Sequence, residues 1–113
     1  MDIDKFTEIA ANIFTAVEDV YTLDETLNVF IFYFECYAQH TGHSHPPIKG
    51  EQIKRIMWCM PWLCEDCSVE IEPYEYPRII RQHFQTKYRN CDFNINHFFS
   101  GRIRYLRYCE TIF

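Results

Sequence analysis

The segment from Thr22 to Thr41 constrains the fold more than any other part of the sequence. Thr22 and Glu25 match a capping box, in which each side chain accepts a hydrogen bond from the backbone N–H of the other residue. Apolar and aromatic side chains follow on every side of the helix that this box begins: Leu23, Leu27, Val29, Phe30, Ile31, Phe32, Tyr33, Phe34 and Tyr37. A helix that is apolar all round is usually buried. The sequence therefore predicts a central helix over about residues 22–41, stopped at Gly42.

A buried strand is the competing interpretation for residues 29–34, and the capping box and the length of the segment favour the helix instead. The first twenty residues predict a second, amphipathic helix, because their apolar residues recur at steps of three and four. These are Ile3, Phe6, Ile9, Ala10, Ile13, Phe14, Val17 and Val20. Such spacing places them all on one face, which we expect to pack on the central helix.

The second half of the chain predicts shorter helices separated by strong breaks. We expect a helix over 51–60 that ends at Pro61, and another over 74–88 that tolerates Pro77 in its first turn. A short helical turn is expected at 94–98, capped by Asp92 or Asn94, and a last helix over 102–108 after Gly101. The alternation of apolar and polar residues at 68–71 predicts a short extended piece.

Together these patterns predict one all-α domain over residues 1–113, a small bundle of four to five helices around the central one. The start of the chain is acidic and leads into an amphipathic helix, so it predicts no signal peptide. The longest apolar run, Val29 to Phe34, is far shorter than the ~20 residues that span a membrane. We therefore expect a cytoplasmic protein, and its six cysteines are expected to be reduced core thiols rather than a disulfide framework.

Charge is divided unevenly along the chain, whose net charge is −5. Residues 1–77 carry four Lys or Arg against fourteen Asp or Glu, which gives −10, and residues 78–113 carry seven against two, which gives +5. Such a split points to an interaction surface. The alternative is that the basic end docks on the acidic body within the same chain, so that the two charges neutralise each other and no interaction surface is implied.

The basic end predicts an arginine and aromatic surface on the last helix. We expect Ile103 and Leu106 of this helix to point inward. The candidate partner-binding residues here are Arg102, Arg104, Arg107, Tyr105 and Tyr108, with the three arginines pointing outward. Arginine next to aromatic rings is the combination that single-stranded nucleic acids bind, and it is equally typical of protein–protein hot spots.

The acidic body predicts a second candidate surface. Its candidate residues are Glu65, Asp66, Glu70, Glu72 and Glu75, which could meet a basic surface on a protein partner. Small acidic helical proteins that occupy the nucleic-acid channels of other proteins, such as anti-CRISPR inhibitors from mobile elements, have this character. No motif identifies this chain as one of them. An ordinary solvated acidic surface would have the same composition.

Chemical motifs are weak throughout the sequence. Cys64 and Cys67 have the two-residue spacing of a zinc-binding pair, and His40, His43, His45, Cys59 and Cys91 could supply the remaining ligands. A second paired motif is missing, and His43 and His45 are expected to be solvated in a proline-rich loop, so we predict no metal. No nucleophile turn, phosphate-binding glycine loop or HExxH motif is present.

The sequence therefore predicts a non-enzymatic protein–protein interaction module without a cofactor, a small acidic inhibitor or adaptor whose partner has a basic surface. The alternative is a nucleic-acid-binding protein that uses the C-terminal third. Neither the partner nor the oligomeric state follows from the sequence.

Overall fold

The computed structural model describes residues 1–14, 20–63 and 69–112, and within them it contains six α-helices, one 3-10 helix and no β-strand. The elements in chain order are α1 (Ile3–Phe14), α2 (Leu23–Thr41), α3 (Gly50–Cys59), η1 (Pro73–Glu75), α4 (Tyr76–Gln85), α5 (Ile95–Phe98) and α6 (Ile103–Thr111). The predicted all-α fold is confirmed. The number of helices exceeds the predicted four to five because the turn expected at 94–98 forms the short helix α5.

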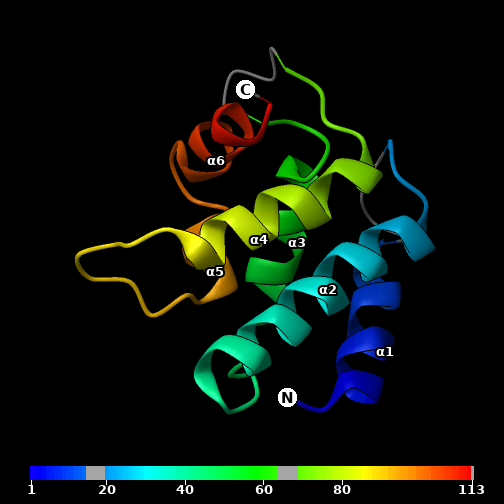
Figure 1. Cartoon of the computed structure of the whole chain (residues 1–113). Coiled ribbons are helices and arrows are strands. Elements are labelled where there is room, and N and C mark those ends of the chain that lie inside the picture. Colours follow the sequence, from blue (N-terminus) through cyan, green and yellow to red (C-terminus); the bar gives the residue numbers. More distant parts are fainter. Residues whose placement is uncertain (15–19, 64–68, 113) are drawn as a thin grey trace.

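Helix α2 crosses the middle of the molecule, with α1 and α4 packed against it (Figure 1). Helix α3 packs on α1, and α6 packs mainly on α4. The N-terminus and the C-terminus lie at opposite ends of this view. No helix in the described part of the chain is both long enough and apolar enough to cross a membrane.

The ends of α2 lie where the sequence predicts them. The Thr22 hydroxyl accepts a hydrogen bond from Glu25 N at 3.1 Å, and the Glu25 carboxylate accepts one from Thr22 N at 2.9 Å. At the other end Gly42 has φ 81°, a left-handed conformation that favours glycine, and its N–H donates to the Ala38 carbonyl. These local hydrogen bonds fix both ends of the central helix.

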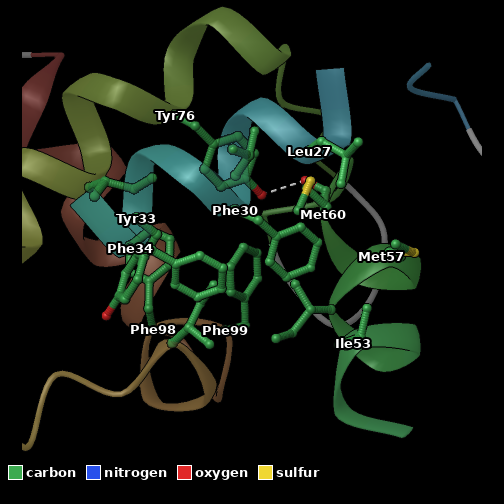
Figure 2. Close-up of a cluster of buried hydrophobic side chains, with 14 of the residues drawn as sticks. Leu27, Phe30, Tyr33, Phe34, Ile53, Met57, Met60, Tyr76, Phe98 and Phe99 are labelled. Atoms are coloured by element: carbon green, nitrogen blue, oxygen red, sulfur yellow. Dashed lines mark hydrogen bonds between the residues drawn. The ribbon is translucent and has the colours of Figure 1, made fainter. Parts of the chain in front are cut away.

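The core gathers around one side of α2 (Figure 2). Phe30, Tyr33 and Phe34 point from α2 toward Phe98 and Phe99. Helix α3 closes this cluster with Ile53 and Met57, and α4 contributes Tyr76. The members with no exposed surface are Ala10, Phe30, Tyr33, Ile56, Met60, Leu63, Tyr76, Ile79, Ile80, Ile95 and Phe98. Each buried aromatic ring removes roughly 150–250 Å² from water, so a chain rich in rings closes a dense core from short helices.

Helix α1 follows its predicted stripe only in part. Phe6 and Ala10 are buried, whereas Ile3 and Ile9 stay 36% and 37% exposed at the edge of the stripe. Val20 was expected on the same buried face and is instead 68% exposed. Val17 lies outside the described residues.

The extended piece expected at 68–71 is found as a single antiparallel bridge between Trp62 and Glu70. Leu63 N donates to Val69 O at 2.8 Å and Ile71 N donates to Pro61 O at 3.0 Å. Ile71 points inward and Glu70 outward, as the alternation predicts. This bridge carries the chain from the end of α3 to η1, and so places the acidic residues that follow it beside α2.

Candidate functional site

A groove of about 420 Å³ lies between the first half of α2 and the segment formed by η1 and the start of α4. Its lining residues are Glu25, Asn28, Val29, Phe32, Glu72, Pro73, Tyr74, Tyr76 and Pro77. The walls are mainly apolar and aromatic, and its two charged lining residues are the carboxylates Glu25 and Glu72. Ligand sites in proteins usually have this make-up, apolar walls with a few polar groups, and occupy ~300–1,000 Å³.

Local sequence signals place both carboxylates. Glu25 sits in the first turn of α2 because the capping box requires a glutamate there, and its Oε1 is engaged with Thr22 N. Glu72 precedes the proline that begins η1, and its N–H donates to the Glu75 carboxylate at 2.8 Å. The two glutamates therefore face the groove from two different helix N-termini, where negative charge is stabilised by the helix dipole.

Two tyrosines on the same short segment have opposite surroundings. Tyr76 is fully buried, and its hydroxyl donates to the Met60 carbonyl and accepts from Arg104, so it anchors the floor of the groove. Tyr74 is 78% exposed, the highest value among the large hydrophobic residues of the described chain. Since Tyr76 is held firmly, the Tyr74 ring stands at the rim of the groove on a fixed backbone.

The predicted acidic surface is found in part at this groove. Glu72 lines it, and Glu70 and Glu72 together line a smaller adjacent cavity with Val20 and Trp62. Glu75 turns away to form an ion pair with Arg78 at 3.6 Å. Glu65 and Asp66 lie outside the described residues.

Among the described residues one ion pair, Arg78 with Glu75, joins the basic end of the chain to the acidic body. The other pair, Arg107 with Glu110, lies within the basic end, and each pair joins residues three apart. Glu70, Glu72 and Glu25 have no ion-pair partner among the described residues. Their negative charge is therefore available at the surface around the groove.

The predicted orientation of the last helix is wrong at three positions, Arg104, Leu106 and Arg107, whose side chain is only 11% exposed although it was expected to point outward. Arg104 was expected to point outward and is only 5% exposed, whereas Leu106 was expected inward and is 44% exposed. The Arg104 guanidinium donates to the Cys59 carbonyl at 3.0 Å and to the Tyr76 hydroxyl at 2.9 Å. It thus satisfies a carbonyl at the C-terminal end of α3, where a cation is favoured by the helix dipole.

The remaining residues of the predicted arginine and aromatic surface are mostly engaged within the chain. Arg107 donates to the Tyr88 hydroxyl at 2.8 Å and pairs with Glu110. The Tyr108 ring is covered by Arg78 at 5.7 Å, and the Tyr105 ring by Arg102 at 5.2 Å. Of the three predicted arginines Arg102 alone is exposed, so the structure does not bring them together on one open face.

The histidines proposed as zinc ligands have different surroundings in the structure. His43 is exposed as expected, but His45 is 1% exposed, which contradicts the expectation that it is solvated. The Nδ1–H of His45 donates to Pro46 O at 2.7 Å, and its Nε2 accepts from Ile95 N at 2.9 Å. Both ring nitrogens are used to hold the loop against the start of α5. Burial lowers the pKa of His45 below its usual range.

No group of three or more His, Cys, Asp or Glu suited to a metal occurs among the described residues. Cys64 and Cys67 lie outside them, so the absence of zinc stays a prediction. Cys36 and Cys91 carry free thiols whose pKa values are raised by burial, which disfavours the reactive thiolate.

A buried hydrogen-bond chain that the sequence did not suggest runs through His83. The Tyr33 hydroxyl donates to Phe93 O at 2.7 Å, so its oxygen accepts from His83 Nε2 at 3.1 Å. Because a neutral imidazole carries one N–H, His83 Nδ1 accepts from the Tyr88 hydroxyl at 2.7 Å. The Tyr88 oxygen in turn accepts from Arg107. The donor of each hydrogen bond in this series is therefore known, because the series ends at a carbonyl, which only accepts, and at a guanidinium, which only donates.

The surroundings of His83 keep its ring neutral. Burial, together with the charges of His97, Arg107 and His40, lowers the pKa of His83 to about 3. Its hydrogen bonds are all made within the protein, and its exposed surface is zero. Both ring nitrogens of His83 are therefore hydrogen-bonded inside the core, and neither is open to a substrate.

The groove itself carries no pairing of a nucleophile with a base among its described lining residues, since its polar members are two glutamates, an asparagine and two tyrosines. Its arrangement suits recognition of a cation. Sequence reasoning found Glu72 but missed Glu25, Phe32 and Tyr74 as parts of a site. The signal for Tyr74 is its position between Glu72 and Glu75, next to a proline.

Comparison of the chain with protein-family models, with curated proteins and with solved structures finds no match. The function is therefore inferred from the residues of the groove and their surroundings.

Proposed function

We propose that this chain is a non-enzymatic protein–protein interaction module that binds a basic surface of a protein partner at the groove between α2 and η1. The observation that carries the proposal is the composition of the groove, in which two carboxylates and an exposed tyrosine border apolar walls. Exposed tyrosines are enriched at binding hot spots, and apolar walls supply the area that such a contact buries.

The charge distribution supports a basic partner. Residues 1–77 carry a net charge of −10, from four cations against fourteen anions, and the carboxylates at the groove are not consumed by ion pairs between described residues. A surface of one sign speeds association with a partner of opposite sign and repels partners of the same sign. An inhibitor or adaptor that covers a basic, nucleic-acid-binding surface of another protein is the role that fits best.

The alternative function, nucleic-acid binding by the C-terminal third, has less support. It requires several arginines on one open face, and Arg104 and Arg107 are tied into the fold. The groove carboxylates would also repel phosphates.

The proposal is tested by charge reversal at the groove, with binding of a fluorescein-labelled arginine- and lysine-rich peptide measured by anisotropy at several salt concentrations. The Glu70→Lys/Glu72→Lys variant should weaken binding at least ten-fold, chiefly through a slower on-rate. Glu75 is left unchanged because it caps η1 and pairs with Arg78. The matched control is Glu8→Lys/Glu35→Lys, which changes net charge equally at exposed positions of α1 and α2. Equal losses in both variants, or no binding by the wild type, would contradict the proposal.

A further inference from the structure

The arginines of this chain are placed on aromatic rings in a consistent way. Five guanidinium groups lie 4.8–5.7 Å from the centre of a ring. The pairs are Arg78 with Tyr108, Arg81 with Phe32, Arg102 with Tyr105, Arg104 with Phe99, and Arg107 with Tyr88. An arginine that approaches a ring face gains a cation–π attraction, and its flat guanidinium stacks well.

Two large rings are more than half exposed and carry no such partner among the described residues: Tyr74 at 78% and Trp58 at 55%. Their charged neighbours differ. Trp58 follows Lys54 and Arg55 by one helical turn on α3, so a cation that approached its ring would be repelled. Tyr74 stands between Glu72 and Glu75, at the rim of a groove whose charged lining residues are both acidic.

The cations nearest this groove are already engaged. Arg78 pairs with Glu75 and donates to the Thr111 hydroxyl at 3.0 Å, and Arg81 lies over Phe32 at the groove wall, 5.1 Å from the ring centre. Glu72 is exposed and unpaired among the described residues, and Glu25 uses one carboxylate oxygen for Thr22. Among the described residues, no cation therefore pairs with the carboxylates that line this groove together with Tyr74.

We infer that the groove receives an arginine side chain of the protein partner, with its guanidinium over the Tyr74 ring and beside the Glu72 carboxylate. This inference rests on the proposed function and names the group that the groove recognises. The apolar walls formed by Val29, Pro73 and Pro77 suit the methylene stem of an arginine. Arginine fits better than lysine because its planar group stacks on a ring while it donates two hydrogen bonds to one carboxylate.

The experiment compares three synthetic peptides of the same length with the wild-type protein, one rich in arginine, one with lysine in its place, and one with neutral citrulline. We expect the arginine peptide to bind several-fold more tightly than the lysine peptide. The citrulline peptide should bind at least ten-fold more weakly than the arginine peptide. Equal binding of the arginine and lysine peptides would overturn the inference, because it would show that charge alone is recognised.

Variants at the ring locate the contact. Tyr74→Ala should lower the affinity for the arginine peptide about five-fold, since a cation–π contact at an exposed site contributes roughly 1 kcal/mol. Tyr74→Phe keeps the ring and should stay within two-fold of the wild type, and the control Trp58→Ala should leave binding unchanged. Since Tyr74 is 78% exposed, its replacement should not change the melting temperature.

The two proposals fail in different ways. If Glu70→Lys/Glu72→Lys abolishes peptide binding while Tyr74→Ala does not alter it, the proposed function stands and the arginine contact at Tyr74 is wrong. If the wild type binds none of the three peptides, both are wrong.

Discussion

The Nε2 atom of His83 lies 3.1 Å from the hydroxyl oxygen of Tyr33, and neither side chain has any exposed surface. This contact joins α4 to the central helix α2. The second hydrogen bond of His83 requires a neutral imidazole, because a proton on Nδ1 would face the Tyr88 hydroxyl, which donates to that nitrogen. It would also add a buried charge near Arg107 of α6, His97 of α5 and His40 of α2, each of which lowers the pKa of His83. The core therefore excludes a proton that the unfolded chain accepts.

The first prediction is that stability falls as the solution is acidified below about pH 6.5, the ordinary pKa of histidine. The folded pKa of His83 is lowered to about 3, so between these values the unfolded state binds a proton that the folded state does not. His45 acts in the same direction, since burial lowers its pKa as well. His83 should lower the free energy of unfolding by about 1.4 kcal/mol for each pH unit of acidification between the two pKa values, and His45 should steepen this fall. Urea unfolding at pH 7 and pH 5 measures the loss.

The control for this experiment is His43→Gln, because His43 is exposed and should leave the pH dependence unchanged. His83→Gln should lower stability at pH 7, and its stability should then fall less steeply between pH 7 and pH 5 than that of the wild type. An unchanged slope in His83→Gln would contradict the assignment of a neutral, buried His83.

The second prediction concerns Arg104. Arg104→Ala removes donors from the Cys59 carbonyl and the Tyr76 hydroxyl and leaves a cavity, so it should lower the free energy of unfolding by about 2–4 kcal/mol. Arg102→Ala, two residues away and exposed, should change it by less than about 0.5 kcal/mol. Urea denaturation of both variants gives the comparison. If both substitutions have equally small effects on the free energy of unfolding, the buried position of Arg104 is wrong.

Arg104 also shows where sequence reasoning reaches its limit. The ends of α2 were predictable because the capping box at Thr22 and the glycine stop at Gly42 are local signals, read from residues within one turn. The role of Arg104 depends on the C-terminal end of α3, 45 residues earlier in the chain, and no local pattern reports that proximity. Polarity alone assigned it to the surface and Leu106 to the interior, and packing reverses both.

The same limit applies to His45 and to the groove. A histidine beside two prolines predicts a solvated loop, whereas tertiary contacts bury His45: its ring packs on Tyr37 and Phe34 of α2, and its Nε2 accepts from Ile95 N, 50 residues away. Glu72 could be predicted as part of an acidic surface from its neighbours along the chain. Glu25 could not, because its place in the groove arises when η1 packs against α2.

The third prediction tests whether α2 is central. Phe30→Ala should lower the free energy of unfolding by about 3–5 kcal/mol, because Phe30 has no exposed surface and contacts Phe6 edge-on, with ring centres 5.1 Å apart. Phe32→Ala on the same helix should cost clearly less, because Phe32 is half-buried at the groove beneath Arg81. Thermal or urea unfolding distinguishes them, and similar costs would contradict the described orientation of α2.

The fourth prediction is that zinc plays no part in the fold. Protein purified without a chelator should contain no stoichiometric zinc by elemental analysis, and a chelator should leave its melting temperature unchanged. Of the histidines near Cys64 and Cys67 in the sequence, His45 has both ring nitrogens engaged by Pro46 and Ile95, which removes it as a ligand. One zinc per chain would overturn this prediction, because structural zinc sites contribute directly to folding.

The last prediction separates the proposed function from nucleic-acid binding. Oligonucleotides should bind no more tightly than the ~10⁻⁴ M typical of weak non-specific contact, because two of the three predicted arginines, Arg104 and Arg107, are tied into the fold and the groove is acidic. Replacing Arg102, Arg104 and Arg107 together is a poor test, since the loss of Arg104 would destabilise the protein. Lys87→Ala/Arg89→Ala/Arg102→Ala removes only exposed cations and preserves the fold. If a fluorescence titration finds sub-micromolar, salt-sensitive binding of RNA or DNA that this triple variant loses, the basic end is the functional surface. The acidic groove would then be an ordinary solvated region.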